Sequence, residues 1–403
     1  MLDEEHERLS PASDRDDNAY VFGEIGNHNI VIACMPMGMT GNTPAALVAK
    51  DLLHSFHHLQ FYLMVGIGGG APNEQNDIRL GDVVVSAPTG QHGGVVQYDF
   101  GKTLAEGRLY RTGTLNRPPN VLLSTLSYLR STYELLGHPT FLKHLATVIS
   151  RYPHHATTFS YPRGIYDTLF EADYDHAMPL QPCEAGCDYG RVIGRGHRAS
   201  NYPSVFFGNI ASANQVMRHG LTRDRIAREH NVLCFEMEAA GLMDQFPCLV
   251  IRGISDYADS HKDDRWQDYA SAVAAAFAKD LLLVTPARDI RDRHHDEHAR
   301  RQPTRSRDTD SPGAMSSQSK VDNNRTRANR PFTPQSSTYA SLDALPSILP
   351  DPRSFDPRYK IMPSAYFEVG KIFSIVDSAS RSATSPNPWL SSKHNQRCAG
   401  ASQ

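Results

Sequence analysis

Short runs of apolar residues that end in glycines or polar residues recur along the first 286 positions of the chain. Each run holds several consecutive apolar residues, which is the pattern of a strand buried on both faces. Such strands predict a mostly parallel sheet that is covered on both sides. They lie at 61–72 (FYLMVGIGGGAP), 82–88 (DVVVSAP), 204–214 (SVFFGNIASAN) and 248–259 (CLVIRGISDYAD).

Helical patterns lie between and after these strands. Thr43 and Pro44 suit the cap and the first turn of a helix that continues through AALVAKDLLHSF. Two further helices are predicted at 239–246 (AAGLMDQF) and 268–284 (DYASAVAAAFAKDLLLV). The order of elements indicates an α/β fold, namely a three-layer α/β/α domain around a central mixed, mostly parallel twisted sheet. Ligands of open α/β sheets bind beyond the carboxyl ends of the strands, so polar residues at those ends are the first functional candidates.

Composition changes at about Pro286. Residues 287–350 are rich in Arg, His, Ser and Asp and poor in large aliphatic residues, so they predict a disordered linker after a folded domain at 1–286. A basic binding site in this linker is the alternative. Residues 351–403 regain apolar character only in PRYKIMPSAYFEVGKIFSIV, which is too short to fold alone. We therefore expect 351–403 to be mostly unstructured.

Charge and cysteine content narrow the class of protein. The formal net charge of −3 gives no reason to expect nucleic acid as a partner. The start, MLDEEHERL, is acidic and unlike a signal peptide, and no apolar run reaches the length of a membrane helix. Six scattered cysteines do not form the pattern of a secreted disulfide scaffold. A cytoplasmic or nuclear protein without membrane contact is expected.

Three strand ends carry candidate chemistry, and each has a structural alternative. The glycines of GIGGG, at 66 and 68–70, allow backbone N–H groups to approach an anion or a sugar, but a tight turn would also need them. Asp256 follows a buried strand, where it is a candidate acid or a cap. Glu236 and Glu238, in CFEMEAAGL, are either ligands or acids in the first turn of a helix.

These pieces together resemble the nucleoside phosphorylase / methylthioadenosine–adenosylhomocysteine nucleosidase superfamily in its fungal form. The likeness runs from Met1 to about Pro286. It rests on four motifs that occur in the family's order, beginning with LMVGIGGGAPNEQNDIRLGDVVVSAPTGQHGGVVQYDFGK and continuing with GNIASANQVM, CFEMEAAGLM and CLVIRGISDYADSHKDDRW. The resemblance implies a nucleoside phosphorylase-like fold, purine nucleosides as ligands and, as is usual in the family, a homo-oligomer.

The resemblance also implies a sugar site. Glu238 matches the carboxylate that accepts hydrogen bonds from the ribose hydroxyls, and Met237 matches the methionine beneath the sugar. Glu236 is the first acid of the same motif, and Trp266 matches an aromatic residue over the far end of the sugar.

For the base and the nucleophile, the resemblance implies a second set of residues. Asp256 matches the general acid beside N7 of the purine, and Arg252 matches an arginine near the attacking water. Protonation of N7 near neutral pH requires a raised carboxyl pKa, which we expect burial of Asp256 to provide. No metal or redox cofactor is required, although phosphate is possible as a co-substrate. The base pocket would include Val216 and Met217, and the water or phosphate side would include Gly68, Gly69 and Gly70.

The chain departs from the family's pattern on the nucleophile side. The family's first strand, with a glutamate that helps to activate water, would fall upstream of Met1, so both are expected to be missing. Met64 stands where phosphorylases carry a phosphate-binding arginine, and Ile67 stands where some nucleosidases have a hydroxyl. These differences favour hydrolysis over phosphorolysis, or a weakened enzyme.

Cys183, Cys187 and the nearby His176 suggest zinc, but a tetrahedral site needs four ligands and His197 is remote. Reduced cysteines without a metal are the expected state.

Two hypotheses remain for the function. The first is an enzyme that cleaves the N-glycosidic bond of purine nucleosides. The second is an inactive nucleoside-binding sensor or interaction module from a fungal receptor-like protein, in which 351–403 would be a fragment of a second fungal domain of unknown function. A nucleic-acid-binding role for the Arg- and His-containing linker is weaker, since the linker also carries acids.

Overall fold

The computed structural model describes the backbone of residues 1–7, 16–105, 109–178, 181–198, 202–287 and 371–377. Almost all of the predicted linker at 287–350, and all of 351–403 apart from 371–377, lie outside the described residues. None of the helices in the described ranges is both long and apolar enough to cross a bilayer.

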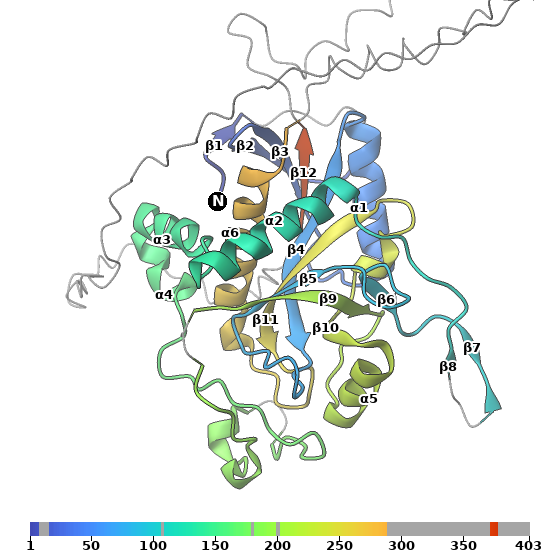
Figure 1. Cartoon of the computed structure of the whole chain (residues 1–403), viewed down its shortest axis with the longest axis vertical. Helices are drawn as coiled ribbons and strands as arrows, with labels where there is room; N and C mark the ends of the chain where they lie inside the picture. The colour runs from blue at the N-terminus through green and yellow to red at the C-terminus, as the bar shows by residue number, and fades with distance from the viewer. Residues whose placement is uncertain (8–15, 106–108, 179–180, 199–201, 288–370, 378–403) are drawn as a thin grey trace, which may run out of the picture. The chain divides into compact units, whose positions relative to one another are not determined.

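The chain folds around one large mixed sheet, which confirms the predicted α/β class (Figure 1). The strands follow the spatial order β1-β2-β3-β12-β4-β10-β9-β5-β11, and β6 pairs with β9. Parallel pairing joins β5, β6 and β10 to β9 and joins β11 to β4, whereas β1, β2, β3, β12 and β4 pair antiparallel. The strands are β1 (Glu4–His6), β2 (Tyr20–Ile25), β3 (His28–Cys34), β4 (Phe61–Gly70), β5 (Val83–Ser86), β6 (Val95–Gln97), β9 (Val205–Ser212), β10 (Val232–Glu236), β11 (Cys248–Asp256) and β12 (Lys371–Asp377). A separate hairpin consists of β7 (Lys102–Thr103) and β8 (Leu109–Tyr110).

The sheet is not fully open, because β11 pairs with β5 on one side and with β4 on the other. Strands β4, β10, β9, β5 and β11 therefore form a closed ring. One edge of β4 is shared, since its first part pairs with β12 and its last two residues pair with β10. This closure brings the carboxyl ends of β10 and β11 next to the glycine-rich end of β4.

Helices cover both faces of the sheet (Figure 1). Along β4, Met64 belongs to the core cluster that includes the buried residues of α1, whereas Leu63 and Val65 belong to the cluster that includes α6. This alternation is the period of a strand buried on both sides. The helices are α1 (Asn42–Ser55), α2 (Asn120–Leu136), α3 (Leu142–Arg151), α4 (Ala156–Phe159), α5 (Gly220–His230) and α6 (Gln267–Val284).

The four predicted strands are found as β4, β5, β9 and β11, and two predicted helices are found as α1 and α6. The helix predicted at 239–246 is wrong: only a short 3₁₀ turn, Ala239–Gly241, occurs there, and Glu236 ends strand β10. Close packing supplies a reason. A Cβ atom on Gly241 would lie 2.2 Å from the backbone oxygen of Asn42, so the start of α1 presses against this turn.

Strand β12 places part of the C-terminal region in the sheet of the first domain. Its residues pair with β3 on one edge and with β4 on the other, antiparallel to both. The sequence suggested a domain that lacks a central strand and a separate fragment at 351–403. In the structure, Lys371–Asp377 instead belongs to the first domain and fills the place between β3 and β4.

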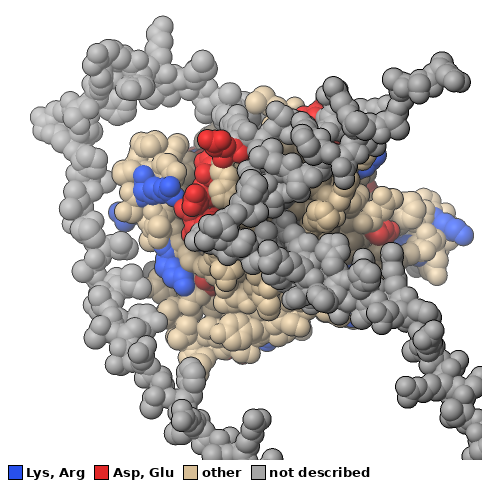
Figure 2. Space-filling model, turned by 90° about the horizontal axis from the view of Figure 1, so that it is seen from above, with Lys and Arg blue, Asp and Glu red and all other residues tan. Residues whose placement is uncertain are grey.

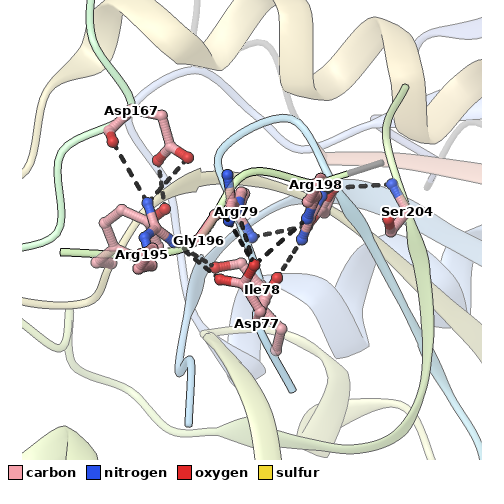
Figure 3. A network of polar contacts seen from close by, with 10 residues as sticks. Asp77, Ile78, Arg79, Asp167, Arg195, Gly196, Arg198 and Ser204 are labelled. Atoms are coloured by element: carbon pink, nitrogen blue, oxygen red, sulfur yellow. Dashed lines mark hydrogen bonds and ion pairs between the residues drawn. The ribbon is translucent and has the colours of Figure 1, made fainter. Parts of the chain in front are cut away.

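A network of arginines and aspartates fixes the segment that precedes β9 (Figure 3). Arg198 donates to Asp82 at 2.8 and 2.6 Å, and the backbone N–H of Ser204 donates to the same carboxylate at 2.8 Å. Arg195 pairs with Asp167 at 2.9 Å and donates to the backbone oxygen of Ile78 at 3.1 Å. The network attaches both ends of the stretch between residues 167 and 198 to the turn before β5.

In the view of Figure 2, Lys and Arg lie beside Asp and Glu on the uncovered part of the face, in keeping with the balanced charge of the chain.

Candidate active site

A cavity of about 180 Å³ lies where strands β4, β10 and β11 end. A larger and more open groove of about 800 Å³ lies elsewhere, but its lining includes none of the site residues predicted from the sequence. The smaller cavity includes most of them, so we take it as the candidate site. Its lining consists of Thr40, Ile67, Gly68, Gly69, Gln215, Val216, Met217, Phe235, Glu236, Met237, Glu238, Ser255, Asp256, Ala258, Lys262 and Gln267.

Glu238 is held in place by the loop before α1. The side chain is buried, and its Oε1 accepts a hydrogen bond from the backbone N–H of Gly41 at 3.0 Å. Gly41 has a φ of 102°, and a Cβ atom there would lie 2.8 Å from the Oδ1 of Asn214. That Oδ1 accepts the N–H of Asn42 at 2.9 Å, so glycine is required for this approach. The loop thereby fixes the direction of a buried carboxylate that the sequence had predicted to bind ribose.

Glu236 has a different role from Glu238. Its carboxylate accepts the backbone N–H groups of Glu238 and Ala239, at 3.0 and 3.1 Å, and pairs closely with Arg252. Arg252 is fully buried on β11, and its Nη2 also lies 3.7 Å from the Oε2 of Glu238. Glu236 therefore anchors the turn that presents Met237 and Glu238 to the cavity. The predicted place of Arg252 beside an attacking water is not found, because Arg252 lies behind the two acids and does not line the cavity.

Asp256 has three polar partners at the end of β11. Its Oδ1 accepts the N–H of Ala258 at 2.9 Å, and its Oδ2 lies 2.8 Å from the ammonium of Lys262 and 3.0 Å from the hydroxyl of Ser255. Burial acts to raise the pKa of Asp256, but these partners, Lys262 foremost, outweigh burial and hold the pKa below its ordinary value. The expectation of a raised pKa is therefore wrong for the free protein, because the ammonium of Lys262, six residues later in the chain, lies against the carboxylate.

Replacing Lys262 with methionine should reverse the effect of pH on stability at this site. In the wild type, the pKa of Asp256 in the folded protein lies below its ordinary value of 3.8. The charged carboxylate therefore stabilises the fold at pH values above 3.8, and this stability is lost as pH falls through the folded-state pKa. In Lys262→Met, only the hydrogen bonds from Ala258 and Ser255 still oppose the effect of burial, which is the largest influence on Asp256. Its pKa should therefore rise, and this site should lose stability as pH rises above 4. We expect a difference of about 1–3 kcal/mol at pH 7 that shrinks toward pH 4, measured by urea unfolding at several pH values.

Lys143→Met is a matched control, since Lys143 is 63% exposed and lies 3.7 Å from Asp280. The ammonium of Lys143 is largely in solvent, and the buried Asp280 keeps its hydrogen bonds with Tyr133 and His144, so the effect of this change should be small at every pH. A loss of stability in Lys262→Met that is the same at pH 4 and pH 7 would contradict the ion pair with Asp256.

The glycines at the end of β4 lie in extended strand rather than in a turn. A Cβ atom on Gly69 would lie 2.6 Å from the Oδ1 of Asp256, and one on Gly68 would lie 2.9 Å from the backbone oxygen of Phe235. Both glycines line the cavity, whereas Gly70 does not. Their absence of side chains lets β4 approach the ends of β10 and β11 closely, which accounts for the glycine run without an anion.

The remaining predicted residues divide between the cavity and the core. Met237, Met217 and Val216 line the cavity, and Val216 is 54% exposed at its mouth. Trp266 does not line it: the side chain is fully buried and packs edge-on against Tyr161, with ring centroids 5.1 Å apart. The prediction of Trp266 over the sugar is therefore corrected, because the next residue along the chain, Gln267, reaches the cavity instead.

Comparison with known proteins identifies a matching family model and several relatives of this chain. Residues 4–285 match the family model described as the phosphorylase superfamily. The chain is 44% identical over 286 residues to a nucleotide-binding leucine-rich repeat (NLR)-like protein of Hyaloscypha variabilis, an alignment that covers 70% of this chain and 27% of that protein. It is 24% identical over 271 residues to the 5'-methylthioadenosine/S-adenosylhomocysteine nucleosidase of Mycobacterium bovis, covering 66% of this chain and 84% of the nucleosidase.

Among solved structures, the nucleosidase of the same name from Neisseria meningitidis, in complex with methylthio-immucillin-A, superposes with a TM-score of 0.43 at 16% identity. The match covers 70% of this chain and 91% of that structure. The chain thus spans most of the bacterial nucleosidases but only about a quarter of the NLR-like relative, at 27%.

Proposed function

The chain belongs to the phosphorylase superfamily, and from that premise we propose that it binds a purine nucleoside and hydrolyses its N-glycosidic bond. One observation carries the proposal. Two buried carboxylates, Glu238 and Asp256, line the same cavity from the ends of two different strands, with Met237 beside the first. The bond to be cleaved develops positive charge on the sugar and negative charge on the base, so two separated acids suit its two halves.

Glu238 binds the sugar of the nucleoside in this proposal. The N–H of Gly41 fixes the direction of the carboxylate, so a carboxylate oxygen can accept hydrogen bonds from the ribose hydroxyls without reorganisation of the side chain. A carboxylate near the ring also stabilises the positive charge that forms as the C1'–N9 bond breaks. Met237 supplies an apolar surface beside it.

Asp256 protonates the leaving base in this proposal, and Lys262 controls the pKa of Asp256. In the free protein Lys262 keeps the pKa of Asp256 low, so the carboxylate is charged at neutral pH. A purine that enters the cavity and separates the ammonium from Asp256 leaves burial as the main influence, which raises the carboxyl pKa. Asp256 then takes up a proton and donates it to N7 as the bond to C1' breaks, while a water oxygen bonds to C1' and gives up its proton to solvent.

Hydrolysis is favoured over phosphorolysis by Met64. This residue is uncharged and 1% exposed, and it does not line the cavity, so its side chain offers phosphate no positive charge there. No metal or redox cofactor is needed for the reaction, and added phosphate is the direct test of a co-substrate.

Asp256→Asn should abolish most cleavage while binding is kept. An amide cannot protonate N7, and loss of general acid help costs about 10²–10⁴-fold in rate. The measurement is release of free base from adenosine, inosine and methylthioadenosine, with and without phosphate, beside nucleoside affinity by calorimetry. Cleavage by Asp256→Asn at the wild-type rate would contradict the role of Asp256, and a strict need for phosphate would contradict hydrolysis.

A second candidate function is an inactive nucleoside sensor. Two observations favour it: the relationship to an NLR-like protein, and the commitment of Glu236 to Arg252, which leaves Glu238 and Asp256 as the other two acids lining the cavity. Glu238 would bind the sugar and Asp256 the base, so none of the acids that line the cavity in the described residues is left to activate water. Wild-type protein that binds nucleoside in calorimetry but releases no base would favour this function over hydrolysis.

A further inference from the structure

A cluster of metal-binding side chains lies outside the candidate active site, in the stretch that we call the cysteine segment (residues 169–198). The ends of its inner loop meet in an antiparallel bridge between Phe170 and Val192. Within the loop, the ligand atoms of His176, Cys183 and Cys187 all lie within 4.8 Å of one another. The spacing arises from a 3₁₀ turn at Cys183–Ala185, after which the chain continues to turn so that the N–H of Cys187 donates to the oxygen of Cys183 at 2.9 Å.

The donor set points to one kind of metal. Two thiol groups and an imidazole are the ligands of structural zinc sites, whereas magnesium and calcium bind to oxygen. We propose that His176, Cys183 and Cys187 bind a zinc ion that joins the cysteine segment to the loop after β11. The sequence favoured reduced cysteines without a metal because only three ligands were close in the chain.

His261 is the fourth ligand in this proposal. Its ring centroid lies 5.3 Å from that of His176, and its side chain is 4% exposed. Neither ring nitrogen of His261 has a hydrogen-bond partner among the described residues. The Nδ1 of His261 lies 3.7 Å from the Oδ1 of Asp259, which is too far for a hydrogen bond. A buried imidazole without a hydrogen bond is costly, and a neighbouring zinc ion would satisfy its Nε2. His261 lies outside the group of three within 4.8 Å, so its ring must shift toward the ion to bind.

The same loop already touches the cysteine segment through protein contacts. The N–H of His176 donates to the hydroxyl of Ser260 at 2.9 Å, and the ring of His261 stacks on Phe170 with centroids 4.0 Å apart. Lys262, the next residue, forms the ion pair with Asp256 at the cavity. A zinc ion at this place would hold the loop, and through it would position Lys262, without taking part in the reaction.

The test uses the full chain, stripped with a chelator and then given zinc or cobalt. We expect about one tightly bound zinc ion per chain by mass spectrometry of the metal. With cobalt, we expect the visible absorption of a tetrahedral ion and a near-ultraviolet band from sulfur-to-cobalt charge transfer. A stripped wild-type chain that takes up no zinc, or that binds cobalt without the sulfur band, would overturn the proposal whatever the variants do.

Variants identify the ligands. Cys187→Ser should weaken zinc binding by more than the ~10–100-fold that outer partners of a zinc ligand contribute, and should reduce the sulfur band. Cys34→Ser, at an exposed cysteine on β3, is the matched control and should bind as the wild type does. Equal loss in both variants would overturn the site. His261→Ala should weaken binding at least ~10-fold, and unchanged affinity would refute His261 as the fourth ligand.

Discussion

Replacing Arg252 with methionine is expected to lower the free energy of unfolding by about 3–5 kcal/mol. The guanidinium is fully buried beside Glu236 and Glu238, so its removal leaves the Glu236 carboxylate in the interior without its ion-pair partner and removes a positive charge from beside Glu238. A domain of this size has a total stability of about 5–15 kcal/mol, so the loss is a large fraction of it. Thermal and urea unfolding measure the change directly.

A double variant separates charge from packing. In Glu236→Gln with Arg252→Met, the uncharged amide oxygen still accepts the N–H groups of Glu238 and Ala239, while one of the two buried charges is gone. Part of the lost stability should return. Arg191→Met is the surface control, because Arg191 is 37% exposed in its pairs with Glu171 and Asp173 and should cost less than about 1 kcal/mol. An Arg252→Met protein as stable as this control would contradict the buried pair.

Deleting residues 367–403 should prevent the domain from folding to a stable, soluble form. The deletion removes β12, whose backbone pairs with β3 and with β4 across the middle of the sheet. Without it, two apolar strands present unpaired N–H and C=O groups, which promote aggregation. Soluble yield, circular dichroism and thermal unfolding measure the result.

Deletion of residues 378–403 alone is the matched control, because it leaves every described strand in place. This shorter deletion should give soluble protein with the unfolding temperature of the full chain. Equal stability of the two truncated chains would show that β12 contributes nothing to the sheet.

The sequence predicted the parts of the fold that rest on local pattern. Strands β4 and β11 are continuous apolar runs, and α6 has an unbroken helical pattern, so each was found. Strand β12 was missed as part of the first domain because its pairing partners lie far away in the sequence, Ala33 about 340 residues before Phe373. Pairing at such a distance leaves no periodic mark in either segment.

In the candidate site too, some residues could be predicted from the sequence, whereas their contacts depend on partners that only the fold brings together. Glu238 and Asp256 were candidates from their places at strand ends, Met237 was added by the family resemblance, and the structure brings all three to one cavity. The position of Glu236 on a strand depends on Arg252, a partner 16 residues away that only the folded sheet supplies. The sign of the pKa shift at Asp256 depends on Lys262, which lies six residues later in a loop of no regular pattern.

Strand β12 also bears on the order in which the protein can assemble during synthesis. The strands that carry the cavity all lie between Phe61 and Asp256, so they emerge from the ribosome before Lys371 is made. Until then the edge of β4 toward β3 has no neighbour from β12, so the ring of β4, β10, β9, β5 and β11 can close while the pairing that links β3 to β4 must await Lys371–Asp377. The entropic cost of so long a loop is only modestly larger than that of a short one, about 0.6 kcal/mol for each doubling of length. A nascent chain halted just after α6 would therefore expose unpaired edges of β3 and β4, and we expect a chaperone that binds these edges to limit aggregation until β12 is made.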